Sequence, residues 1–153
     1  MTKYITIVLC FMFATPLVAA QDTAKMRQAM DKGIAFLRAT QSNTGGWSAS
    51  PRTGIGPTAV ILAGLIDAGV DVDDPMIANG FKLLESSVRE DGGVYTPDGF
   101  FQNYETCVVV MCFALTNEAA KKKNGSEPYK ELLAKAEKYL REQQYSENKS
   151  TRP

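Results

Sequence analysis

The sequence predicts an all-α fold in which two kinds of helix alternate along the chain. Runs with one apolar stripe at helical spacing alternate with runs that are apolar almost all round. The stretch from Gly33 to Gly46 also aligns without gaps with the stretch from Gly80 to Gly93, which indicates a repeated unit of about 47 residues. Turn residues separate the runs, and about five helices with short connections fit between residues 21 and 145.

Residues 1–20 are predicted to be a secretory signal peptide. Lys3 gives a positive start, residues 5–13 form a short apolar core, and small residues precede Gln21. The apolar run is too short for a membrane-spanning helix. We therefore expect a secreted or periplasmic protein with no transmembrane segment after cleavage; the alternative is an uncleaved membrane anchor.

Composition excludes several classes of function. The chain has 17 basic and 17 acidic residues and no histidine. A balanced charge without a basic stripe argues against a nucleic-acid partner. Without histidine, the Ser–His and Cys–His nucleophile pairs and the commonest zinc ligand are missing, so we expect no metal or other cofactor. Cys107 and Cys112 lie on different faces of one predicted helix and are expected to be small, unpaired core residues.

The first helix is predicted over residues 23–40, and turn residues end it before the first double glycine. Its apolar face follows helical spacing through Met26, Met30, Gly33 and Leu37. The second helix is predicted over residues 57–68, with Pro57 in its first turn and Gly69 after its end. This second run is apolar almost all round, so we expect it to be buried on most sides.

The third helix is predicted over residues 75–89. It has a single apolar stripe made of Ile77, Phe81, Leu84 and Val88. The fourth helix, over residues 104–120, is again apolar all round from Cys107 to Leu115. Its valine run would also suit a strand, but its length and its alignment with the second helix favour a helix.

The fifth helix is predicted to begin at Pro128 and to carry a stripe that includes Ala136 and Tyr139. Residues 146–153 are polar and form either a tail or a point of truncation. Striped helices would cover the apolar ones from outside, in two layers. An inner helix of this kind cannot be buried by one unit alone, so the pattern needs neighbouring units.

The stretch from Lys32 to Trp47, with Gln41 and Gly46, resembles the QW repeat of squalene–hopene cyclases. More widely, the chain is similar to the prenyltransferase/squalene oxidase repeat, particularly to secreted bacterial repeat proteins of unknown function. The resemblance implies a partial α/α toroid over residues 21–145, an incomplete ring that further repeats or another chain would complete. The second copy departs from the pattern with Val88 and Tyr95. The zinc site of the related protein prenyltransferases does not carry over, because the chain has no histidine.

A glutamine at a helix end can bond backbone groups that have no partner there. An aromatic residue after the double glycine can fold back onto the next inner helix. We therefore expect a structural role for the matching positions, with a ligand-binding role for Trp47 as the alternative. These positions are Gln41, Gly46, Trp47, Gly93 and Gln144.

The acidic residues Asp71, Asp73 and Asp74 match the letters of the DxDD motif with which squalene–hopene cyclases protonate their substrate. Clustered carboxylates can raise one another's pKa, as a general acid requires. However, the motif runs into Pro75 at the start of a striped helix, where an aspartate is expected to act as an N-cap. We prefer the N-cap interpretation and keep the acid as the alternative.

A second candidate site combines aromatic and charged residues in the two loops that precede the apolar helices. Aromatic rings with a carboxylate could hold an apolar or carbocation-like ligand. Alternatively, the rings pack beneath the loop and the acidic residue occupies a helix first turn. The candidate ligand-facing residues are Arg52, Tyr95, Phe100, Phe101, Tyr104 and Glu105.

The sequence thus predicts an exported, non-metallic repeat protein that acts as a binding or scaffolding module for an apolar ligand or a protein. Whether the chain is an enzyme stays open, and we favour a module without catalysis. The alternative is a terpene or polyprenoid cyclase-like enzyme, an isomerase or lyase that uses one of the three aspartates as its acid. A third possibility is an interaction module that assembles with itself.

Overall fold

The computed structural model describes residues 23–47, 53–97 and 99–144. The chain divides into two compact units, one ending at Ala39 and the other beginning at Thr40. The predicted signal peptide over residues 1–20, Arg52 and the polar tail over residues 146–153 lie outside the described residues.

The described part of the first unit is helical, and its helix runs over residues 23–40, where apolar spacing predicts one. Met26 and Met30 are large, exposed apolar side chains on this helix. A single helix offers no second element against which these side chains could pack. The first unit therefore has no apolar core of its own in the residues described.

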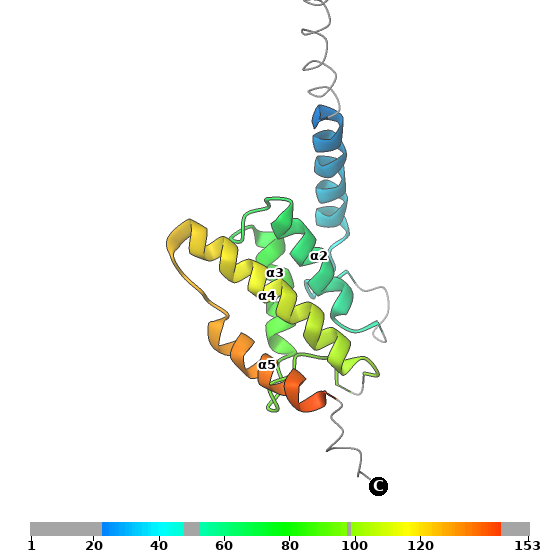
Figure 1. The fold of residues 1–153 in the computed structure, drawn as a ribbon. Coiled ribbons are helices and arrows are strands. Elements are labelled where there is room, and N and C mark those ends of the chain that lie inside the picture. The colour runs from blue at the N-terminus through cyan, green and yellow to red at the C-terminus, as the bar shows by residue number, and fades with distance from the viewer. Residues whose placement is uncertain (1–22, 48–52, 98, 145–153) are drawn as a thin grey trace, which may run out of the picture. The chain divides into compact units, whose positions relative to one another are not determined.

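The described part of the second unit confirms the predicted all-α class. Figure 1 shows its four helices, which are α2 (Gly56–Asp67), α3 (Pro75–Ser86), α4 (Gln102–Asn124) and α5 (Lys130–Gln143). Proline stands in the first turn of α2 and of α3, where its missing N–H costs no helical bond. Gly125 caps α4 at a φ of 78° and donates its N–H to the carbonyl of Lys121.

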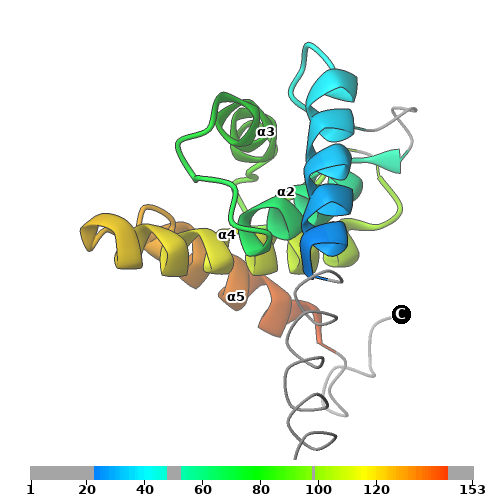
Figure 2. The ribbon, with the colours of Figure 1, turned by 90° about the horizontal axis from the view of Figure 1, so that it is seen from above.

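Helices α2 and α4 lie side by side and run in the same direction (Figures 1 and 2). Gly56, at the start of α2, is next to Tyr104 and Glu105, at the start of α4. At the other end, the turn after α2 is tied to α4, because Lys123 binds Asp71. Two runs that the sequence describes as apolar all round therefore form one parallel pair.

Helix α3 runs antiparallel to α2 and packs on both members of the pair. Gly80 lets α3 approach α2 closely, since a Cβ built there would lie 2.7 Å from the Leu62 side chain. Phe81 of α3 contacts Phe113 of α4 with ring centroids 5.9 Å apart. In Figure 2, α3 is seen nearly end-on beside the pair.

Helix α5 runs back along α4 (Figures 1 and 2). At its start, the Tyr129 ring stacks on the Phe113 ring with the ring centroids 4.1 Å apart. The Tyr129 N–H donates to Asn117 Oδ1 at 2.9 Å. Near its end, the Tyr139 hydroxyl donates to Asn103 Oδ1 at 3.3 Å. Burial is the largest cause that raises the pKa of Tyr129, so its hydroxyl remains protonated and donates to Glu85.

Two predictions about this core are wrong. The third helix ends at Ser86 rather than near Arg89, because Val88 leaves the helix to pair with Val94 in an antiparallel bridge. Cys107 is exposed, whereas Cys112 is buried as expected. The apolar character of α4 on all sides led to the second error, since one of its faces stays uncovered in the described structure.

Candidate functional site

The double glycines form two corners that make matching contacts with the striped helix that follows. Gly45 and Gly92 have φ values of 88° and 89°, a region that favours glycine. A side chain at Gly45 would collide with the backbone carbonyl of Asn79, and one at Gly92 would lie 2.9 Å from that of Lys135. Both corners therefore require glycine for conformation and for close approach.

The second glycine of each corner also faces its striped helix in the same way. A Cβ built at Gly46 would lie 2.9 Å from the side chain of Leu83, and one at Gly93 would lie 3.0 Å from that of Tyr139. Leu83 and Tyr139 occupy matching positions, one before the leucines Leu84 and Leu140. The contact with the next helix is thus made twice.

Threonines tie the corners to α2 and α4. The Trp47 N–H donates to Thr58 Oγ1 at 3.3 Å, and the Val94 N–H donates to Thr106 Oγ1 at 3.1 Å. Thr58 and Thr106 are both fully buried. The only signal for them in the sequence is that each opens an apolar run at the same point of the alignment.

Gln41 bonds the backbone at two places, as expected of a glutamine at a helix end. Its Nε2 donates to the carbonyls of Gly45 and Met76, each at 2.9 Å. Gln144 occupies the corresponding place after α5, where it is exposed and its backbone N–H donates to the carbonyl of Arg141 at 3.3 Å. The contacts of Gln41 hold its own corner against the start of α3.

The three aspartates are engaged in local structure. Asp74 caps α3, and its carboxylate accepts the Met76 N–H at 2.8 Å, so the N-cap interpretation is confirmed. Asp71 and Asp73 bind the Lys123 ammonium at 2.6 and 2.7 Å. The hydrogen bond from Lys123 is the largest cause that lowers the pKa of Asp71. A lowered pKa is the opposite of what a general acid requires.

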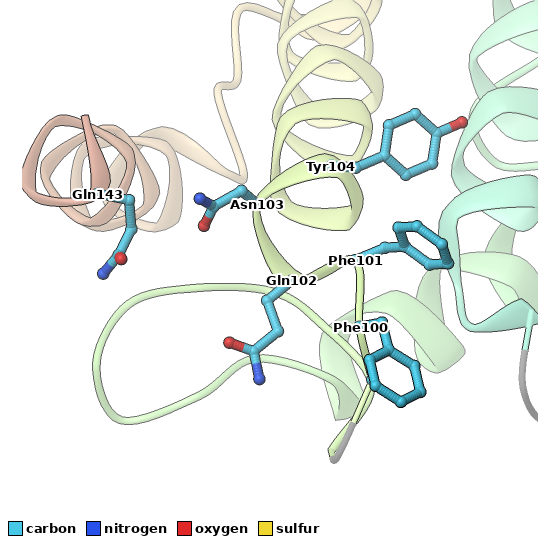
Figure 3. Close-up of a pocket in the computed structure, with 7 residues that line it drawn as sticks. Phe100, Phe101, Gln102, Asn103, Tyr104 and Gln143 are labelled. Atoms are coloured by element: carbon cyan, nitrogen blue, oxygen red, sulfur yellow. The ribbon is translucent and has the colours of Figure 1, made fainter. Parts of the chain in front are cut away.

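The turn before α4 exposes its aromatic residues. Phe100 is 98% exposed, and Phe101 and Tyr104 are also exposed. In Figure 3 these three rings lie on one side of the turn, while the amides of Asn103 and Gln143 lie on the other. An open hollow of about 430 Å³ is lined by Gly99, Phe100, Phe101, Gln102, Asn103, Tyr104 and Gln143.

Two of the predicted ligand-facing residues are not part of this hollow. Glu105 is only 3% exposed, and its carboxylate accepts the Thr96 N–H at 2.6 Å, which anchors the loop. Gly54 packs directly on that carboxylate. The Tyr95 ring contacts the Tyr139 ring with the ring centroids 5.9 Å apart. The Tyr95 hydroxyl donates a hydrogen bond to the Asp91 carboxylate at 2.7 Å. That bond is the main cause that raises the pKa of Tyr95 to about 12.

The exposed aromatic turn continues into an uncovered apolar face of α4. Tyr104 is followed along the helix, at helical spacing, by further exposed or half-exposed uncharged residues. Met111 in the middle of this face is 49% exposed. We call this surface the α4 stripe, and it consists of Tyr104, Cys107, Met111 and Ala114.

The described residues contain no group of three histidine, cysteine, aspartate or glutamate side chains that could hold a metal ion. Burial raises the pKa of the Cys112 thiol to about 12, so this sulfur stays protonated and is a poor nucleophile.

No helix among the described residues is both long and apolar enough to cross a membrane. Comparison with protein-family models, with curated proteins and with solved structures finds no match. The resemblance to the prenyltransferase/squalene oxidase repeat therefore stays a prediction from the sequence.

Proposed function

We propose that this chain is an exported α/α-repeat module of the prenyltransferase/squalene oxidase type that binds a protein and does not transform a substrate. The observation that carries this proposal is the α4 stripe. Tyr104 and Met111 of this stripe, with Phe100 and Phe101 before them, remain exposed. Large exposed apolar side chains that adjoin one another are typical of interaction surfaces.

The matching corners support the repeat part of the proposal. Equivalent positions of two successive sequence repeats make equivalent contacts. These are the glycine contacts of Gly46 and Gly93 and the hydroxyl bonds of Thr58 and Thr106. In a repeat protein each unit packs on its neighbours, and the last unit in a row leaves one face open. The α4 stripe has the composition and the position of such a face.

The cyclase-like alternative receives no such support. Its acid residues Asp71 and Asp73 are exposed and bind Lys123, and Asp74 holds the start of α3. The hydrogen bond from Lys123 lowers the pKa of Asp71, which does not favour proton donation, and the carboxylate of Asp74 is engaged as a helix cap. Turnover of a polyprenoid by the purified protein would nevertheless overturn the proposal.

The proposal is tested by replacing Met111 with a photoreactive phenylalanine derivative in cells that export the protein. Irradiation is expected to give covalent protein adducts, because the side chain at position 111 lies at the contact. The matched control carries the same group at Ala134, an exposed residue of α5 away from the stripe. Adducts that are no more abundant at position 111 than at position 134 would contradict the proposal.

A further inference from the structure

We infer that the α4 stripe docks on the open face of α2 in a second copy of this chain, so that copies associate head to tail. This inference rests on the proposed function, because it names the partner that the stripe binds. It derives from the way in which α2 and α4 already pack on each other within one chain.

The face of α2 that meets α4 begins at Gly56, which lies against Tyr104 and Glu105. It continues at helical spacing through further small or apolar residues, all of which are buried. These residues are Gly56, Ala59, Ala63 and Ile66. The alignment that pairs Thr58 with Thr106 places them opposite Tyr104, Cys107, Met111 and Ala114, in that order.

In the alignment of the two repeats, the α4 stripe is therefore the same face of α4 that α2 turns towards α4. Ala63 is 5% exposed, whereas its equivalent Met111 is 49% exposed. Ala63 lies on the face of α2 that begins at Gly56 and packs on α4, whereas Met111 lies on a face of α4 that no described element covers to the same extent. If another helix packed on α4 in the same way as α4 packs on α2, it would bury the α4 stripe.

The alignment also identifies the surface of α2 on which the stripe of another copy would dock. The side of α4 that meets α2 begins at Glu105 and continues through Val109, Cys112 and Thr116, all of them buried. Their equivalents on α2 are half-buried or exposed, and we call them the open α2 face: Pro57, Ile61, Gly64 and Ala68. One chain thus presents both halves of the contact that it makes internally.

The chemistry of the two surfaces matches. Neither the α4 stripe nor the open α2 face contains a charged residue. Gly64, the equivalent of Cys112, has no side chain, so it leaves room for the longer side chain of Met111. The chain has a formal net charge of zero, so copies do not repel one another strongly. Because the two surfaces differ, the contact is heterologous and propagates into an open row or closes into a ring.

Two single substitutions block the two surfaces separately. Gly64→Glu blocks the open α2 face and preserves the fold, since a Cβ at Gly64 meets no atom within 4 Å. Met111→Glu blocks the stripe at a half-exposed position. Ala134→Glu is the control on an exposed position of α5. Circular dichroism checks folding, and Cys107→Glu replaces Met111→Glu if that variant does not fold.

Sedimentation of the purified chains measures the outcome. The average mass of the wild type and of Ala134→Glu is expected to rise with concentration. Gly64→Glu and Met111→Glu alone are each expected to weaken association at least about tenfold. An equimolar mixture of these two variants should form a particle of two chains and no larger one, because the intact stripe of one docks on the intact α2 face of the other.

Three results would overturn the inference: a wild type that stays monomeric, a Gly64→Glu variant that associates as the wild type does, or a mixture that does not form the two-chain particle. The crosslinking experiment distinguishes a failure of head-to-tail association from a failure of the proposed binding function. Adducts at position 111 with other proteins alone would leave the binding module standing and remove the second copy as its partner. A lack of adducts at that position would remove both.

Discussion

At the scale of single residues, two buried hydroxyl groups connect the corners to the helix pair. Thr106 accepts the Val94 N–H and donates to the carbonyl of Gln102 at 2.8 Å. Thr58 accepts the Trp47 N–H in the same way. A buried backbone N–H that loses its acceptor costs considerably more free energy than an average hydrogen bond contributes. The threonines are therefore specific determinants of the corner geometry.

We predict that Thr106→Val lowers the free energy of unfolding by about 1–3 kcal/mol, because it keeps the shape of the side chain but leaves the Val94 N–H without its acceptor. Urea unfolding followed by circular dichroism measures the loss. Thr116→Val is the matched control, because the Thr116 hydroxyl bonds within its own helix to the carbonyl of Cys112. Equal losses for the two variants would show that the corner bond has no special role.

The pH dependence of Tyr95 gives a second prediction at this scale. Its pKa is raised to about 12, chiefly by the hydrogen bond to Asp91, whereas an unfolded tyrosine titrates near 10. The neutral hydroxyl therefore stabilises the fold below about pH 10, and this contribution is lost as the pH rises towards 12. Asp91→Asn should lower the pKa of Tyr95. NMR titration of labelled tyrosine tests this, and a wild-type pKa near 10 would contradict it.

At the scale of helices, two glycines in the interior of helices have different roles: Gly80 is buried and Gly64 is exposed. Gly80 sits in α3 against Leu62, which is fully buried and has no room to move. Gly64 sits in α2 on its open face, and a Cβ there would meet no atom. Glycine in a helix costs about 1 kcal/mol relative to alanine unless packing requires it.

We therefore predict opposite effects of the same substitution. Gly64→Ala should raise the free energy of unfolding by about 0.5–1 kcal/mol. Gly80→Ala should lower it by about 1–3 kcal/mol, because its methyl group would overlap Leu62. Thermal unfolding at low protein concentration measures both changes. A stabilising effect of Gly80→Ala would show that α3 can move away from α2 without cost.

At the scale of the whole molecule, the second unit is organised around the parallel pair α2 and α4. The turn that joins α2 to α3 is bound to the end of α4 through Lys123, and the corners hold the other ends. Helix α3 packs on α2 and helix α5 on α4, and the residues of the α4 stripe and of the open α2 face stay exposed or half-buried in the described structure.

Association through these surfaces makes thermal stability depend on concentration. A partner that binds the folded state and not the unfolded state raises the midpoint of unfolding by mass action. We predict that the Tm of the wild type rises as its concentration is increased a hundredfold, while that of Gly64→Glu does not. Calorimetry at a series of concentrations measures both, and parallel behaviour of the two proteins would argue against head-to-tail association.

Local patterns predicted the helices well and predicted burial less well. Apolar spacing, proline and glycine identified the helical segments, and the acidic turn was recognised as an N-cap because Asp74 precedes Pro75. The fourth helix was expected to be a buried inner helix that is apolar all round from Cys107 to Leu115, yet Cys107 and Met111 are exposed. The composition of a helix indicates whether its faces favour apolar contacts. It does not indicate whether another helix packs on each face.

The candidate site shows the same limit. The sequence placed Glu105 and Tyr95 with Phe100 and Phe101 because they are close along the chain. The structure buries Glu105 beneath Thr96 and turns Tyr95 towards Asp91 and Tyr139, so only part of the predicted set lines the hollow. Arg52 lies outside the described residues. Direction of a side chain depends on which partners the fold brings near, and loop sequence alone does not specify them.

The sequence by itself determined the helical class, the order of striped and apolar helices and the two glycine corners, because these depend on spacing and backbone preference within a few residues. Only the tertiary structure decided that α2 and α4 run parallel and that the hydroxyl groups of Thr58 and Thr106 anchor the corners. It also decided which apolar face stays uncovered. These properties arise from contacts between residues far apart in the chain, and a local sequence pattern does not specify such contacts.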